Sequence, residues 1–377
     1  MKIPQFKLDH WLNTYHFADN PPTFDFAAST GPHWTLGELL SFVNSGERES
    51  LLETELVYSA AAGSERLRQA IADMVGVAPE YVRVVTGASE ALLIVFCVAA
   101  ETGANVLLPF PLFPSTAVGP QLFKLETRFY HLRRENGFAV DIDEIRGLVD
   151  NKTKALLVNS PHNPTGATVT NDTMRELYDF ALDHGIQFIS DEVYHPIYHG
   201  DETSSAASLP QATVIGSFSK SLSLSGIRTG WIIDRNVERL RQYTDARSYF
   251  TISNPPLAEK FAQIAIRNRD KVFAHTREVA GSNLQLLDEF FSQYADKLSW
   301  VRPRGGLTAF PWLNDGSDAR TFCEKLVQRG VLLVPGDCFD VPNHFRFGFG
   351  VTSKGFGEGL ARMGEVLKTT DLTASAA

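Results

Sequence analysis

The sequence predicts an α/β protein of two domains, a large one with helices on both faces of a mostly parallel sheet and a smaller α+β one. Three observations lead to this fold class. The chain has 377 residues, more than one ordinary hydrophobic core accommodates. From about residue 60, apolar runs typical of strands alternate with segments of helical periodicity. Beyond about residue 294 this alternation gives way to short β-rich runs and two further helices.

The large domain is expected to hold a mixed sheet of about seven strands. Its first helix is "GSERLRQAIADMVG", in which Leu67, Ile71 and Met74 recur at helical spacing and Gly76 marks the end. "YVRVVTGASEALLIVFCVAA" then predicts a strand, a glycine turn and a buried helix. Further β-rich runs are "ANVLLPF", "LETRFYHL", "TKALLVNS", "IQFISDEVY" and "TVIGSFS". Helical segments such as "TNDTMRELYDFALDHG" separate several of these runs.

The pattern after the large domain predicts a smaller α+β unit. A long helical region runs from about Pro256 to Tyr294. The β-rich runs beyond it are "LSWVRPRGGLTAFPWL", "VLLVPGDCF" and "HFRFGFG", and helices are expected around "ARTFCEKLVQRG" and "GFGEGLARMGEVLK". We therefore divide the chain into an N-terminal arm (1–45) that contributes to the small domain, a large domain (46–285) and a small C-terminal domain (286–377).

Composition and charge exclude several classes of partner. The net charge is −9 and the Lys and Arg residues are scattered, so we expect no nucleic-acid partner. The most apolar window, "ALLIVFCVAA", is shorter than the roughly 20 residues that cross a bilayer, and the N-terminus lacks the apolar run of a signal peptide. We expect a cytoplasmic protein without a membrane partner. The three cysteines form neither a metal-ligand pattern nor a disulfide framework.

Polar residues follow the predicted strands at their carboxyl ends, where ligands bind in such sheets. "RVVT" is followed by Gly87, Ala88 and Ser89, a turn that opens a helix whose free N–H groups suit a phosphate. "KALLVN" is followed by "SPHNPTG", in which Asn163 lies between two prolines that stiffen the turn. Taken singly, each segment has a structural alternative, a turn or loop without a ligand.

The next two strands end at ionisable residues. "IQFIS" ends at Asp191, and a carboxylate at the end of a buried strand needs a partner. The protonated ring nitrogen of a cofactor would serve, as would a helix N-cap or a structural salt bridge. "TVIGSFS" leads to Lys220, which serines and Arg228 accompany. Most lysines are solvated surface charges, but an amine beside such phosphate donors is suited to forming a Schiff base.

The order of these motifs resembles one known family. "GASEAL", "NSPHNPTG", "SDEVY", "SFSKSLSLSGIRTGW" and a late "RFGF" are similar to the pyridoxal 5′-phosphate (PLP) dependent aminotransferases of class I/II, fold type I. The resemblance extends from about residue 24 to the C-terminus. "LVYSAAAGSERLRQAIA" resembles the family's Tyr-x4-Gly-x3-Leu-Arg element. The resemblance to this family implies that residues 46–285 form the PLP-binding domain.

The resemblance also implies roles for individual residues. Lys220 would hold PLP as an internal aldimine, Asp191 would pair with the pyridinium nitrogen, and Tyr194 would bond the phenolic oxygen together with Asn163. Phe113 would stack on the ring. The residues expected to hold the phosphate are Ala88, Ser89, Ser217, Ser219 and Arg228, joined by Tyr58 from the second protomer of a homodimer.

The substrate side of the site is implied in the same way. Arg346 would bind the α-carboxylate, beside Asn163, and Gly31 would lie in the N-terminal segment that closes over the substrate. No second arginine stands where the family binds a distal carboxylate. Candidates for a side-chain pocket, each with packing or surface exposure as the alternative, are His33, Trp34, His195 and Tyr249.

The expected function is transfer of an amino group between an α-amino acid and a 2-oxo acid. The alternative is a PLP-dependent lyase or cyclase, acting by β-elimination or cyclisation. The N-terminal segment, "RGGLTAFP" and "GVLLVPGDCF" resemble the branch that contains capreomycidine synthase, whereas "DEVY" has the aminotransferase form and differs from that of the C–S lyases. A third reading, an effector module of a transcription regulator, is disfavoured by the acidic charge and by the forty or so residues that precede the motifs.

Overall fold

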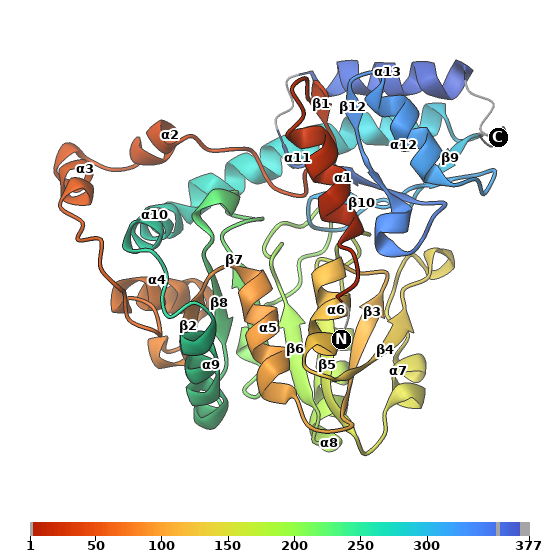
Figure 1. Ribbon diagram of the computed structural model, residues 1–377. Coiled ribbons are helices and arrows are strands. Elements are labelled where there is room, and N and C mark those ends of the chain that lie inside the picture. Colours follow the sequence, from red (N-terminus) through yellow and green to blue (C-terminus); the bar gives the residue numbers. More distant parts are fainter. Residues whose placement is uncertain (1–2, 352–354, 370–377) are drawn as a thin grey trace.

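A seven-stranded sheet lies at the centre of the computed structural model, which describes residues 3–351 and 355–369 (Figure 1). The strand order is β2-β8-β7-β6-β5-β3-β4. Neighbours from β7 to β4 are parallel, whereas β8 runs antiparallel to both β7 and β2. The strands are β2 Val82–Val85, β3 Asn105–Phe110, β4 Glu126–His131, β5 Thr153–Asn159, β6 Gln187–Asp191, β7 Thr213–Ser217 and β8 Gly230–Ile233. The mostly parallel mixed sheet predicted from the sequence is confirmed.

Helices cover both faces of this sheet because successive side chains of each strand point to opposite sides. In β7, Val214 packs into one apolar core and Ile215 into the other. Helices α5, α6 and α9 cover the face of Ile215, and α4, α7 and α8 cover the face of Val214. These helices are α4 Glu65–Val75, α5 Ala88–Ala99, α6 Pro114–Leu122, α7 Ile142–Leu148, α8 Asn171–Asp183 and α9 Val237–Phe250.

Local sequence explains where several helices begin and end. Helix α4 stops at Gly76, whose φ of 73° is the left-handed conformation that glycine adopts freely. The apolar helix expected after the first strand is α5, and six of its 12 residues are buried. The long helical region predicted near the C-terminal third is two helices, α10 Pro256–Arg267 and α11 Arg269–Gln293. They are divided at Asn268, whose side chain donates to the carbonyl of Ile264 at 2.9 Å.

A smaller unit of short strands packs above the carboxyl ends of the large sheet (Figure 1). Strand β14 lies between β10 and β13, β9 pairs with β11, and β1 pairs with β12. The strands are β1 Phe24–Asp25, β9 Leu298–Ser299, β10 Thr308–Ala309, β11 Trp312–Leu313, β12 Val331–Leu332, β13 Val334–Pro335 and β14 Phe345–Gly348. Helices α12 Ala319–Val327 and α13 Phe356–Thr369 complete the unit.

The N-terminal arm reaches this smaller unit before the chain enters the large one. Its helices are α1 Lys7–His16, α2 Leu36–Leu40 and α3 Ser45–Leu52. Trp11 of α1 is buried and donates its indole N–H to the carbonyl of Leu333 at 2.7 Å, while β1 runs parallel to β12. The boundary that we propose at residue 285 lies within α11, a continuous helix.

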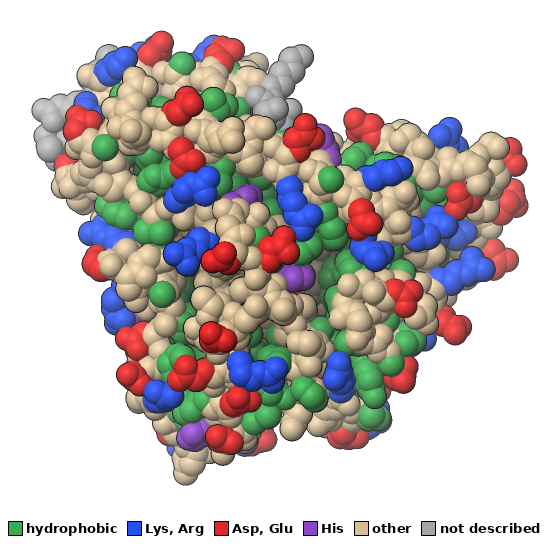
Figure 2. Space-filling view, turned by 180° about the vertical axis from the view of Figure 1, so that it is seen from behind, with side chains coloured by type: hydrophobic (Ala, Val, Ile, Leu, Met, Phe, Trp, Pro, Cys, Tyr) green, Lys and Arg blue, Asp and Glu red, His purple; other side chains and the backbone are tan. Residues whose placement is uncertain are grey.

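The outer surface is mixed in charge on the face drawn in Figure 2. Lys and Arg side chains there are interspersed with Asp and Glu, without an extended area of one sign. Within residues 3–351 and 355–369, no helix is both long and apolar enough to span a bilayer.

Candidate active site

A cavity of about 230 Å³ lies at the carboxyl ends of β5, β6 and β7, beside the first turn of α5. Nine of the residues proposed from the sequence line it: Ala88, Ser89, Phe113, Asn163, Asp191, Ser217, Ser219, Lys220 and Arg228. Segments far apart in the chain therefore meet at one place, as expected for the carboxyl edge of a parallel sheet.

One end of the cavity is suited to a phosphate. The first amides of α5 point out of the helix, where they have no partner within it. Ser217 Oγ donates to Ser219 Oγ at 2.9 Å, and Arg228 Nη1 lies 3.5 Å from the same Ser219 oxygen. Hydroxyls, a guanidinium and helix amides thus converge on one rim. Ser89 and Arg228 are exposed in the single chain, so this rim is open.

Glycine is required at position 87, immediately before α5. Its φ is 81°, and a Cβ placed there would lie 2.8 Å from Arg228 Nη2. A side chain at this position would therefore strain the backbone and displace the arginine from the rim.

Asp191 is buried at the end of β6 with little compensation for its charge. Its Oδ1 accepts a hydrogen bond of 3.2 Å from the Val193 N–H. Burial is the main cause that raises the pKa of Asp191 to about 7, and the neighbouring Glu192 adds to the effect. A cationic ligand placed beside this carboxyl would stabilise its ionised form.

Lys220 lies in the same cavity, in the loop that follows β7. Burial lowers its pKa to about 7, and the positive charges of Arg346 and Arg228 act in the same direction. The amine is therefore neutral for much of the time at physiological pH, as a nucleophile or base must be. Its Nζ donates to the hydroxyl of Ser29 at 2.8 Å.

Asn163 and Arg346 form the opposite end of the site. The backbone N–H of Asn163 donates to Asn159 Oδ1 at 2.9 Å, and Arg346 Nη1 donates to Asn163 Oδ1 at 3.3 Å. Arg346 also donates through Nη2 to the carbonyl of Ala27 at 2.9 Å. Its Nε is buried without a hydrogen-bond partner among the described residues, so an anionic ligand would satisfy it.

Tyr194, Phe113 and Gly31 border the site in different ways. The buried Tyr194 donates its hydroxyl to the carbonyl of Ser29 at 3.1 Å. Phe113 lines the cavity. Gly31 does not line it. Gly31 packs against the loop that follows β7 and carries Lys220 (the lysine loop), so closely that a Cβ on Gly31 would lie 2.1 Å from Ser223 Oγ.

Tyr58 lies outside this cavity. Its side chain is 80% exposed and lines a surface groove with Leu56, Val57 and residues 253–256. The cavity of this one chain is therefore built without it.

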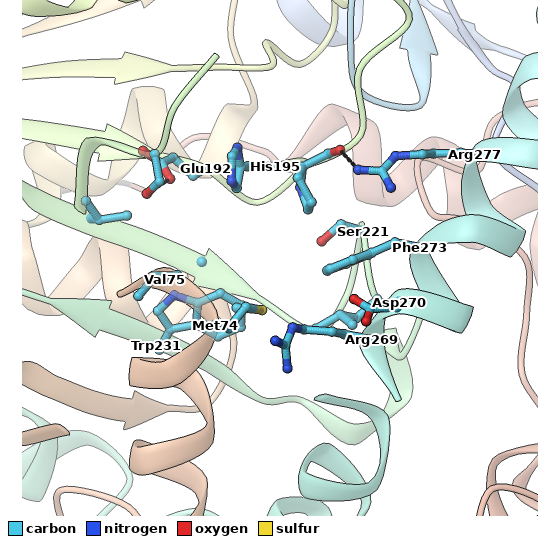
Figure 3. A pocket seen from close by; sticks show the side chains of 15 residues that line it. Met74, Val75, Glu192, His195, Ser221, Trp231, Arg269, Asp270, Phe273 and Arg277 are labelled. Atoms are coloured by element: carbon cyan, nitrogen blue, oxygen red, sulfur yellow. Dashed lines mark hydrogen bonds between the residues drawn. The ribbon is translucent and has the colours of Figure 1, made fainter. Parts of the chain in front are cut away.

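A second, larger cavity of about 370 Å³ lies behind the lysine loop (Figure 3). Met74 from α4, Arg269 and Arg277 from α11, and Ser221 surround it, and none of the residues predicted to hold PLP or the substrate carboxylate lines it. His195 lines this second cavity. The other side-chain candidates also lie away from the first one: His33 and Tyr249 are exposed, and Trp34 packs against His275.

Asn159 and Ser29 are among the residues of the first site that sequence reasoning missed. Asn159 lines the cavity, and its Nδ2 donates to the carbonyl of Asp191 at 3.0 Å. Its position at the carboxyl end of β5 is the signal that would have found it. Ser29 lies 191 residues from Lys220, and nothing in its local sequence indicates the contact.

Comparison with known proteins agrees with this geometry. The family described as aminotransferase class I and II matches residues 26–363. A capreomycidine synthase of Streptomyces vinaceus is 30% identical over 97% of this chain and 95% of its own length. An aspartate aminotransferase of Pyrococcus abyssi is 29% identical over 84% of this chain and 85% of its own.

Solved structures are similar over nearly the whole chain. A PLP-dependent aminotransferase from Streptococcus suis has a TM-score of 0.92 at 28% identity, covering 98% of this chain and 99% of its own. A PLP-dependent cyclase, OrfR, has a TM-score of 0.89 at 25% identity, covering 98% of both chains.

The residues of the cavity fit PLP, the cofactor that these similarities establish. The serine and arginine rim suits its phosphate, the buried Asp191 suits a protonated ring nitrogen, and the neutral Lys220 suits its aldehyde carbon.

Replacing Gly87 is expected to weaken PLP binding. Gly87→Ala should lower the affinity of cofactor-free protein for PLP by about 10- to 100-fold, because a strained residue costs about 1–3 kcal/mol and its Cβ meets Arg228. Titration followed by absorbance measures this. Gly76→Ala is the matched control, with a φ of 73° but no atom within 4 Å, and should leave the affinity unchanged. Equal affinities for the two variants would contradict the prediction.

Asp191→Asn is expected to stabilise the cofactor-free protein, by an amount that grows between about pH 5 and pH 7. The pKa of Asp191 is about 7 in the folded protein and has its ordinary value of 3.8 in the unfolded chain, so the folded wild type binds more protons in this window and loses stability as pH rises. The amide does not titrate. Thermal unfolding of both proteins across this range measures the difference.

The exposed Asp201 provides the control for this measurement. Asp201→Asn should change Tm by an amount that does not grow between about pH 5 and pH 7, unlike the change expected for Asp191→Asn. A pH-independent effect of Asp191→Asn would rule out the raised pKa.

Proposed function

The chain belongs to the aminotransferase class I and II family, and from this we propose that it transfers an amino group between an α-amino acid and a 2-oxo acid, using PLP. The observation that carries the proposal is the common cavity of Lys220 and Asp191, with the phosphate rim at one end and Arg346 bordering the other. A base, an anionic partner for a cationic ring and a carboxylate-binding arginine are the groups that such a reaction needs.

The chain's own residues have separate tasks in this mechanism. Ser217, Ser219, Arg228 and the first turn of α5 would hold the cofactor by its phosphate. PLP, when bound, supplies a carbonyl for the substrate amine and a cationic ring that withdraws the electron pair left at the α-carbon. Asp191, kept from solvent at the end of β6, would maintain the charge of that ring.

Lys220 and Arg346 would act on the substrate. Arg346 is buried with its Nε unpaired, so a carboxylate would bind it and fix the orientation of the α-carbon. The neutral amine of Lys220 would take the α-proton and return it at a different atom. The lowered pKa of Lys220 allows one group to serve as both base and acid near neutral pH.

A second candidate reaction has a specific observation in its favour. The relative named capreomycidine synthase matches 97% of the chain, more than the aspartate aminotransferase does. Cyclisation or β-elimination also begins with loss of the α-proton, so it would use the same lysine and the same Asp191. The two candidates differ in the fate of the substrate after that step.

The product of a single turnover tests the proposed function. Loaded protein is mixed with a panel of amino acids without a 2-oxo acid. Transamination should release a 2-oxo acid in an amount equal to the protein and leave pyridoxamine phosphate. Repeated turnover with release of ammonia, or of a cyclic amino acid, would instead establish the second candidate.

Lys220→Ala should abolish either reaction. We expect a rate loss of about 10³-fold or more, because the variant lacks the base. Borohydride reduction followed by mass spectrometry should find the cofactor fixed to residue 220 of the wild type only. Full activity in Lys220→Ala would exclude the assignment.

We further propose that the enzyme is a homodimer in which Tyr58 completes the phosphate site of the partner. The exposed apolar side chains of Leu56 and Val57 line the same groove as Tyr58, and Leu52, shortly before them in the chain, is exposed as well. The phosphate rim of the single chain is open at Ser89 and Arg228. An exposed apolar surface and an open rim are both explained by a second copy of the chain.

Mixed dimers test this arrangement. Tyr58→Ala and Lys220→Ala should each be impaired as homodimers, whereas subunits of the two variants co-expressed should form hybrids with one complete site. We expect recovery of up to about half of the wild-type activity per hybrid dimer. Failure of the mixture to recover, with hybrids present by mass spectrometry, would exclude a role for Tyr58 across the interface.

A further inference from the structure

The side chain of Ser29, in the N-terminal segment, reaches the lysine of the site. Lys220 Nζ donates to Ser29 Oγ at 2.8 Å, the one hydrogen bond that Nζ makes within the described part of the chain. The carbonyl of the same serine accepts from the Tyr194 hydroxyl at 3.1 Å. A single residue outside the large sheet therefore contacts two side chains of the proposed catalytic set.

The backbone that carries Ser29 is held in place. Asp25 Oδ1 accepts from the backbone N–H groups of Ala27 and Ala28 at 2.9 and 3.1 Å. Arg346 Nη2 donates to the carbonyl of Ala27 at 2.9 Å. A hydroxyl on so restrained a segment is a fixed acceptor rather than a mobile one.

Lysine needs such an acceptor because its four-carbon stem is flexible. To remove the α-hydrogen of the substrate, Nζ of Lys220 would have to lie close to it. A misplacement of about 1 Å can cost about 100-fold in rate. A hydrogen bond from one N–H to Ser29 restrains the amine and leaves its lone pair available.

We propose that Ser29 is a positioning residue, whose hydroxyl holds the Lys220 amine while that amine removes the α-proton of the substrate. In this step the lone pair of Nζ would form a new N–H bond as the Cα–H bond breaks, and bound PLP would accept the electron pair left on the α-carbon. The proposal rests on the proposed PLP-dependent function, and it applies to transamination and cyclisation alike because both begin here.

Ser29→Ala and Thr30→Val form a matched pair of variants. Thr30 is the next residue of the same segment, and its Oγ1 is buried without a hydrogen-bond partner among the described residues. Each variant loses one hydroxyl, but only Ser29→Ala loses the contact with Lys220. Ser29→Thr retains a hydroxyl and should restore what Ser29→Ala loses.

The first readout does not depend on turnover. PLP is added to cofactor-free protein, and the fraction fixed to Lys220 by borohydride is followed over time by mass spectrometry. Ser29→Ala should react about tenfold more slowly than the wild type, because its amine is no longer held in place. Thr30→Val should react at the wild-type rate.

The second readout is the kinetics of the loaded enzyme. Ser29→Ala should lower kcat by about 10- to 100-fold with little change in KM, and an α-deuterated substrate should show a larger isotope effect. The positioning role would be overturned if Ser29→Ala had the wild-type rate of PLP fixation and wild-type kinetics. It would also be overturned if Ser29→Ala and Ser29→Thr lost activity equally. If Ser29→Ala does not fold, Ser29→Cys, with a weak acceptor, replaces it and should show the same losses.

The result for the wild type distinguishes a failure of the PLP-dependent function from a failure of the positioning role of Ser29. No cofactor fixed to wild-type Lys220 would overturn the proposed function and the role of Ser29 with it. Cofactor fixed normally, with no effect of Ser29→Ala on either rate, would overturn the role of Ser29 alone.

Discussion

The site depends on the burial of the Lys220 amine and the Asp191 carboxyl, which ionise to opposite charges, at one edge of the sheet. Burial moves both pKa values to about 7, from opposite sides, so neither charge is fully stabilised by the protein itself. Arg346 and Arg228 add to the effect on the lysine. Neither group has a partner in the cavity that fully stabilises its charge, and a ligand that carries a cationic ring and an aldehyde would satisfy both residues at once.

The remainder of the fold delivers the other groups to this pair. Parallel strands β5, β6 and β7 end at the same edge, which brings the Asn163 loop, Asp191 and the lysine loop together. Arg346 comes from β14 of the smaller unit and reaches Asn163 and Ala27. The end of the site that Arg346 borders therefore lies where the two units and the N-terminal arm meet.

Residues whose position follows from local context could be predicted from the sequence. Asp191 and Lys220 stand at the ends of apolar runs, and Gly87 stands between a strand and a helix, so their meeting follows from the rule for parallel sheets. The contact of Ser29 with Lys220 spans 191 residues and depends on how the arm packs, which no local pattern encodes. The break at Asn268 was missed because periodicity continues through both helices.

The pairing of β1 with β12 has a consequence for how the protein is made. Phe24 and Asp25 leave the ribosome about 300 residues before their strand partners, Val331 and Leu332. Contacts between such distant segments form slowly, because a long loop must close before they can stabilise the chain. The large sheet can assemble during synthesis, whereas the arm that carries Ser29 waits for the C-terminal unit. The contact between Ser29 and Lys220 therefore forms only after the C-terminal unit has joined the large sheet.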